Sequence, residues 1–121
     1  MIATEPLIKL LTLAEETLAN SPKTHMSQAI VFLTQAGNTY CFYTPLDNYS
    51  ATEDQIVAIL SEKNYTAINS LVAMWENGSI DIVSHSLRKK LIALNESNQN
   101  AWMFLRGDSG YTVCTINSTM T

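Results

Sequence analysis

The sequence predicts an α+β fold, in which an antiparallel sheet of four to five strands from two β-hairpins carries three to four packed helices. Two pairs of β-branched and aromatic runs, each joined by a segment of turn-forming residues, indicate the hairpins. Leucines recurring at helical spacing near the N-terminus indicate the first of the helices. With 121 residues the chain has the usual length of one domain, and we expect a single globular domain over residues 1–121.

The first predicted element is a helix over Leu7–Leu18. Its apolar residues recur at i, i+3, i+4, i+7 and i+11, whereas charged residues occupy the other face. The apolar face consists of Leu7, Leu10, Leu11, Ala14 and Leu18. Such a face packs against a core or against a second protein copy, and both alternatives stay open.

The two predicted hairpins are 29–33 with 39–44, and 101–105 with 111–116. The run Ala29–Leu33 is apolar on both faces, which is typical of a central strand covered on both sides. Each hairpin follows a helix and has a cysteine in its second strand, and an internal duplication would place Cys41 and Cys114 on neighbouring strands. We expect the two cysteines to be buried, reduced thiols, with a disulfide between them as the alternative.

Between the hairpins, Ser50-Ala51-Thr52-Glu53 fits a capping box at the start of a helix. A second helical segment is predicted up to Trp75, because Ile68, Leu71, Val72 and Trp75 have helical spacing. The competing interpretation is a third hairpin, in which Asn77-Gly78 is the turn.

A short edge strand over 79–83 and a helix over 84–96 are expected next. The start of this helix is unusual, because Arg88, Lys89 and Lys90 lie where the helix dipole disfavours cations. The simpler explanation is that the helix begins earlier, near Asp81. We interpret the three cations as a solvated helix face in preference to a patch for an acidic partner.

The composition excludes several functional classes. Hydrophobic residues make up 46% of the chain and charged residues 15%, which argues against intrinsic disorder. The formal net charge of −4 argues against a nucleic-acid partner. No stretch resembles a signal peptide or a membrane span, so we expect a cytoplasmic protein with no membrane partner.

No motif for catalysis, a metal or a cofactor is present, and we therefore expect no catalytic residues, no metal and no cofactor. The whole chain contains two cysteines and two histidines, at spacings that no zinc motif uses. Neither a dinucleotide-binding nor a P-loop glycine pattern occurs. These absences favour a protein that is not an enzyme.

The predicted function is a small, acidic protein-interaction module, such as an inhibitor, an immunity or antitoxin-like protein, or a chaperone that binds a basic protein. Its contact surface would combine tyrosines with acidic residues, because tyrosine is enriched at binding hot spots. The candidate residues are Tyr43, Leu46, Asp47, Tyr49, Glu53 and Asp54. Two alternatives stay open: a small-molecule-binding domain or minor enzyme with a pocket between sheet and helices, and a homo-oligomeric subunit.

Overall fold

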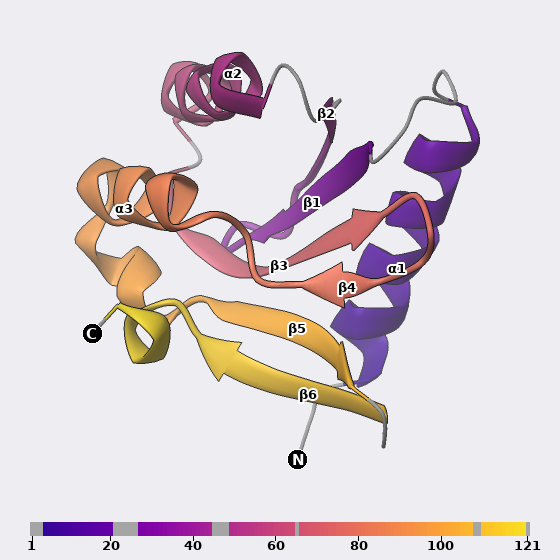
Figure 1. Ribbon diagram of the computed structural model, residues 1–121. Helices are drawn as coiled ribbons and strands as arrows, with labels where there is room; N and C mark the ends of the chain where they lie inside the picture. The colour runs from indigo at the N-terminus through magenta and orange to yellow at the C-terminus, as the bar shows by residue number, and fades with distance from the viewer. Residues whose placement is uncertain (1–3, 21–26, 45–48, 65, 108–109, 121) are drawn as a thin grey trace.

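A computed structural model of the protein describes residues 4–20, 27–44, 49–64, 66–107 and 110–120 (Figure 1). This part of the chain forms three α-helices, six β-strands and two short 3-10 helices. In chain order, the elements are α1 Thr4–Ala19, β1 Gln28–Thr34, β2 Thr39–Thr44, α2 Tyr49–Glu62, β3 Ile68–Trp75, β4 Ile80–Asp81, α3 His85–Leu94, η2 Glu96–Asn100, β5 Trp102–Gly107, β6 Gly110–Thr115 and η3 Asn117–Thr119.

All six strands belong to one sheet. Five of them follow the order β2-β1-β3-β5-β6, and the sixth, β4, pairs with β3. The α+β class and both predicted hairpins, β1–β2 and β5–β6, are confirmed. The sheet is mixed, however, because β3 and β5 pair in parallel, with Ser70 opposite Trp102 and Leu71 opposite Met103. A parallel pair needs a long crossover connection, and the segment containing α3 provides it.

The helix predicted up to Trp75 is wrong, and the competing hairpin is right. Ile68–Trp75 is strand β3, and it turns at Asn77-Gly78 into β4. Gly78 has a φ of 88°, in the left-handed region that such turns require, and the Trp75 amide donates to the Ser79 carbonyl at 2.8 Å. β3 is buried on both faces, and its apolar run Leu71–Trp75 matches helical spacing as well as strand spacing.

The helices cover both faces of the sheet. α1 lies on one face, whereas α2 and α3 lie on the other (Figure 1). Alternate residues of β1 belong to the two apolar cores, since Ile30 and Phe32 pack towards α2 and α3, and Ala29 and Val31 pack towards α1. β1 is therefore the central, doubly covered strand that its sequence predicts.

α3 begins at His85, and the predicted earlier start near Asp81 is wrong because Asp81 belongs to β4. Ser84 is the N-cap, and its side chain accepts a hydrogen bond from the Leu87 amide. α3 ends at Leu94, and the 3-10 helix η2 replaces the rest of the predicted helix. None of the described helices has the length and apolar character that a bilayer crossing requires.

The two cysteines lie on opposite edges of the sheet, Cys41 on β2 and Cys114 on β6. Cys41 is exposed and Cys114 is half-buried, so the prediction of two buried thiols is wrong. The sheet order also separates the strands that a duplication would have made neighbours. Both thiols are free, and burial raises the pKa of the Cys114 thiol.

Candidate functional site

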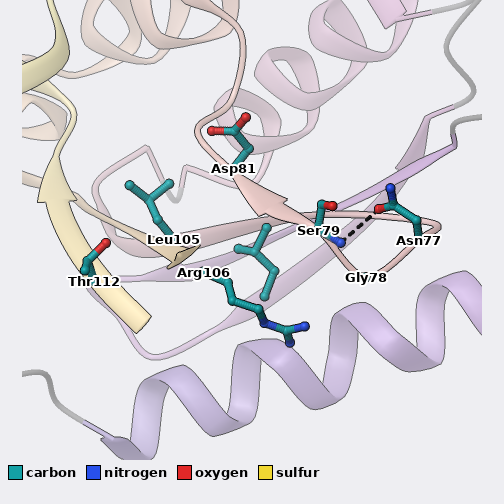
Figure 2. A pocket seen from close by; sticks show the side chains of 8 residues that line it. Asn77, Gly78, Ser79, Asp81, Leu105, Arg106 and Thr112 are labelled. Carbon is teal, nitrogen blue, oxygen red and sulfur yellow. Dashed lines mark hydrogen bonds between the residues drawn. The ribbon is translucent and has the colours of Figure 1, made fainter. Parts of the chain in front are cut away.

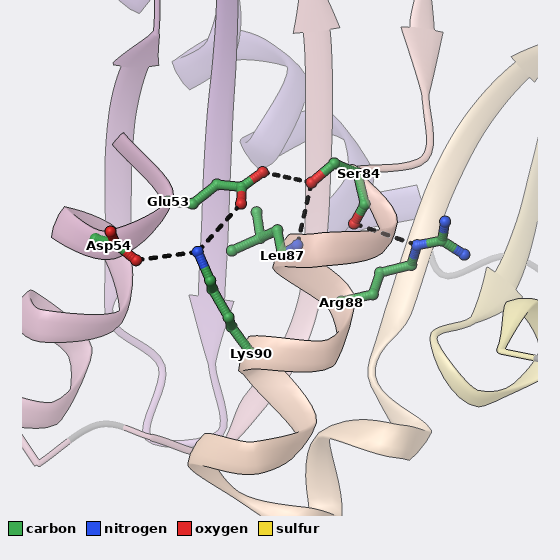
Figure 3. A network of polar contacts seen from close by, with 6 residues as sticks. All are labelled: Glu53, Asp54, Ser84, Leu87, Arg88 and Lys90. Atoms are coloured by element: carbon green, nitrogen blue, oxygen red, sulfur yellow. Dashed lines mark hydrogen bonds and ion pairs between the residues drawn. The ribbon is translucent and has the colours of Figure 1, made fainter. Parts of the chain in front are cut away.

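The starts of α2 and α3 meet at a buried carboxylate (Figure 3). Glu53, near the start of α2, is only 3% exposed. The Ser84 hydroxyl, at the cap of α3, donates a hydrogen bond to Glu53 Oε2 and accepts one from the Leu87 amide at 3.0 Å. A single hydroxyl thus caps one helix and ties it to the other.

Lys90 completes this cluster from the second turn of α3. Its Nζ lies 3.4 Å from Glu53 Oε1 and 3.0 Å from Asp54 Oδ1. The hydrogen bond to Asp54 raises the pKa of the Lys90 ammonium, burial opposes this rise, and Glu53 reinforces it. Glu53, Asp54, Ser84 and Lys90 are called the Glu53 network below.

The two ion pairs of Lys90 differ in their surroundings. The Asp54 side chain is 73% exposed, whereas the Glu53 side chain is 4% exposed. An exposed pair contributes little to stability, but a buried carboxylate is costly without partners. The sequence predicts that Glu53 caps its own helix; in the structure its two oxygens contact Lys90 and Ser84 of the neighbouring segment.

The sequence predicts that the three cations of α3 form a solvated helix face, and the structure shows that not all of them do. Arg88 is only 8% exposed. Its Nε donates to the Ser84 carbonyl at 3.4 Å, and its Nη1 donates to the Thr119 carbonyl at 3.1 Å, which joins α3 to η3. Only Lys89 of the three is exposed. Arg88 and Lys90 are thus held near the helix start by specific acceptors, which offset the unfavourable helix dipole.

A hollow of about 350 Å³ opens beside the Glu53 network, on the first turns of α3. Its lining residues are His85, Ser86, Lys89 and Lys90. Lys90 belongs to both the hollow and the network, so a molecule in the hollow would lie next to the ion pair with Glu53. The hollow is open to solvent, because His85, Ser86 and Lys89 are exposed.

A larger hollow, about 610 Å³, lies between the β3–β4 turn and the β5–β6 hairpin (Figure 2). Its charged residues do not converge. The Arg106 guanidinium extends towards α1, while the Asp81 carboxylate points away from it (Figure 2). Because binding and catalysis need convergent polar groups, the Glu53 network is the better candidate site.

Strand β1 carries a second buried polar position, on the face of the sheet that α2 and α3 cover. Gln28 is 1% exposed, and its Oε1 has no hydrogen-bond partner among the described residues. Its register partner is Thr44 at the end of β2, and both positions share the face of Ile30 and Phe42, which pack with α2 and α3. A buried unpaired acceptor is uncommon and is usually matched by water or a ligand.

The structure separates the residues predicted as a contact surface. Tyr43 packs against the α1-side core, whereas Glu53 and Asp54 lie on α2, over the opposite face. Leu46 and Asp47 lie outside the described residues, as does the side chain of Tyr49, which begins α2. Ser84 and Lys90 were not predicted, although the unusual cations at the start of α3 were a signal for them.

No protein-family model matches the sequence, and a comparison with curated proteins finds no similar sequence. Solved structures do match. The cytidine deaminase of Mycobacterium leprae superposes with a TM-score of 0.69 at 14% identity, over 93% of this chain and 94% of that one. The cytidine deaminase of Burkholderia pseudomallei gives 0.68 at 12% identity, over 92% and 93%. That of Mycobacterium tuberculosis gives 0.64 at 13% identity, over 93% and 91%. The fold is that of the cytidine deaminases.

The cytidine deaminase fold overturns the predicted non-enzymatic interaction module. Proteins whose solved structures share this fold along nearly the whole chain are enzymes, so inhibitor, immunity and chaperone functions are not supported. The alternative prediction, a small-molecule-binding domain or minor enzyme, fits the fold better. Self-association stays a prediction.

Nucleobase deaminases use a zinc ion held by His and Cys ligands, with the signature H-x-E … P-C-x-x-C. The residues of this chain do not fit that ion. None of its seven glutamates has a His or Cys two positions earlier, and no C-x-x-C occurs. The two cysteines lie on opposite sheet edges, and the described residues contain no group of three His, Cys, Asp or Glu side chains able to hold a metal.

Proposed function

We propose that the protein is a small-molecule-binding protein with the fold of an enzyme, and that its ligand, of the nucleobase or nucleoside class, binds beside Glu53. The observation that carries the proposal is the buried Glu53 carboxylate, which lies next to a solvent-open hollow in a cytidine deaminase fold. The class of ligand is inferred from that fold.

The chemistry of Glu53 suits an amino-bearing base. A carboxylate accepts hydrogen bonds from the exocyclic amino group of cytosine. An ionised carboxylate offers about four lone-pair sites, and the contacts with Ser84 and Lys90 use two of them. A further bond to a ligand is therefore compatible with the network. The same carboxylate has the chemistry of a general acid or base, which makes Glu53 the candidate for catalysis as well.

Thermal unfolding in the presence of cytosine, cytidine and deoxycytidine tests the proposal, with uridine as the comparator that lacks the amino group. A ligand at 100 times its Kd raises the free energy of unfolding by about 2.7 kcal/mol. We expect such a shift with an amino-bearing ligand and a smaller one with uridine. The Glu53→Gln variant should show a smaller shift, because it lacks the negative charge and has one accepting oxygen where the carboxylate has two.

Glu62→Gln is the matched control, since Glu62 is an exposed acid at the other end of the same helix. It should keep the shift. Ammonia release measured in the same samples separates the two roles of Glu53: release that Glu53→Gln abolishes makes it a catalytic residue, and binding without release makes it a binding residue. The proposal is wrong if none of these ligands stabilises the protein, or if Glu53→Gln binds as tightly as the wild type.

A further inference from the structure

Two segments that meet at the Glu53 network can be set against the deaminase zinc signature. We place Ala51-Thr52-Glu53, at the start of α2, against the H-x-E half, and Ser84-His85-Ser86-Leu87, at the start of α3, against the C-x-x-C half. The glutamate is present, but alanine, serine and leucine stand at the positions of the three metal ligands. Alanine and leucine have no atom that binds a metal, and zinc sites use Cys, His, Asp or Glu.

Ser84 and Leu87, at two of these positions, make other contacts in the structure. The Leu87 side chain is fully buried in the core, in a cluster that includes Ile56 and Leu60 of α2. The Ser84 hydroxyl bonds to Glu53 and to the Leu87 amide, and Lys90 places an ammonium group 3.4 Å from Glu53 Oε1. An ammonium group next to the carboxylate supplies positive charge and would repel a divalent cation.

We propose that the Glu53 network takes the structural place of the metal, so that Lys90 and Ser84, without zinc, hold the starts of α2 and α3 together. The contacts bridge the two helices through a carboxylate that is almost completely buried, the setting in which loss of one partner is most costly. The network joins the helices whether or not a ligand is bound, so the inference stands apart from the ligand class.

The metal content of the purified full-length protein gives the first test. We expect well under one zinc per chain by elemental analysis, and the same thermal midpoint in EDTA, in added zinc and in plain buffer. A ligand that binds only the folded state would raise the midpoint, so zinc binding would be visible as a shift. About one tightly held zinc per chain, together with a midpoint lowered by EDTA, would overturn the proposal.

The second test compares Lys90→Met with Lys89→Met, which removes the exposed cation next to it on the same helix. Lys90→Met leaves Glu53 without its cation, and we expect the midpoint to fall by roughly 5 °C or more. Lys89→Met should change it by about 1 °C. Equal midpoints for the two variants would show that the ion pair with Glu53 does not join the helices.

A double-variant cycle separates the ion pair from unrelated damage at either position. If Lys90 and Glu53 stabilise the fold through each other, Lys90→Met combined with Glu53→Gln should lower the midpoint by less than the sum of the two single changes. Additive losses would contradict the proposed bridge. All these measurements are made without ligand, so they can fail while the ligand assay succeeds, and the reverse.

Discussion

Asn98 is a buried polar side chain that makes three hydrogen bonds to the backbone. It is completely buried, and its Oδ1 accepts a hydrogen bond from the Ile68 amide at 2.8 Å. Its Nδ2 donates to the carbonyls of Leu91 at 2.8 Å and Thr66 at 2.9 Å. One amide group therefore joins the end of α3 to the start of β3. The sequence does not reveal this role, because Asn98 stands within the polar run Glu96–Asn100.

We expect Asn98→Ala to lower the free energy of unfolding by about 3 kcal/mol, because it leaves the buried Ile68 amide without its acceptor and removes a donor from the Leu91 and Thr66 carbonyls. Asn100→Ala is the control, since Asn100 is exposed in the same short helix, and it should change the free energy by less than about 0.5 kcal/mol. Urea unfolding of both variants measures the difference. Similar losses would mean that the three hydrogen bonds contribute little.

At the scale of elements, the sequence predicts local pairs well and fully buried strands poorly. The β1–β2 and β5–β6 hairpins were predicted because each consists of two β-favouring runs joined by a turn. β3 was missed because burial on both faces removes the alternation that marks a strand. The Asn77-Gly78 turn was the decisive signal, because it predicts the observed hairpin whereas the helical spacing predicts a helix.

The β3–β4 turn gives a prediction at this scale. Gly78 has a φ of 88°, and a Cβ added there would meet only Arg106 Nη1, at an ordinary 3.9 Å. The cost of Gly78→Ala is therefore conformational, and we expect about 1 kcal/mol from thermal or urea unfolding. Gly78→Asn should cost less, because asparagine tolerates the left-handed region. If asparagine costs as much as alanine, backbone conformation is not the cause.

At the scale of the whole molecule, the sequence predicts the α+β class but not the order of the strands. The parallel pairing of β3 with β5 joins residues about thirty positions apart in the chain, and no local pattern records such a partner. The contacts of the candidate site also join residues that are distant in the chain. Glu53 was selected as an acid beside tyrosines, but its partners Ser84 and Lys90 reach it only through the packing of α3 on α2.

The strand order predicts that the two thiols behave independently. Cys41 is exposed on one edge of the sheet, whereas Cys114 is half-buried on the other, where burial raises the pKa of its thiol. A thiol-reactive disulfide reagent should give two phases, because less thiolate is present at Cys114 and access to it is poorer. Cys41→Ser should remove the fast phase and Cys114→Ser the slow one. A single phase in the wild type would contradict this order.

The pairing of β3 has a consequence for how freely the surface can vary. One edge of β3 is shared, since Ser70 and Leu71 pair with β5, while Ala73 and Met74 pair with β4. The sheet forks at this point, and the 610 Å³ hollow of Figure 2 fills the space between the two branches. Backbone pairing therefore creates the hollow. An exposed lining residue such as Thr112 can change in size and charge with little loss of stability, so the surface at this fork can vary while the core stays unchanged.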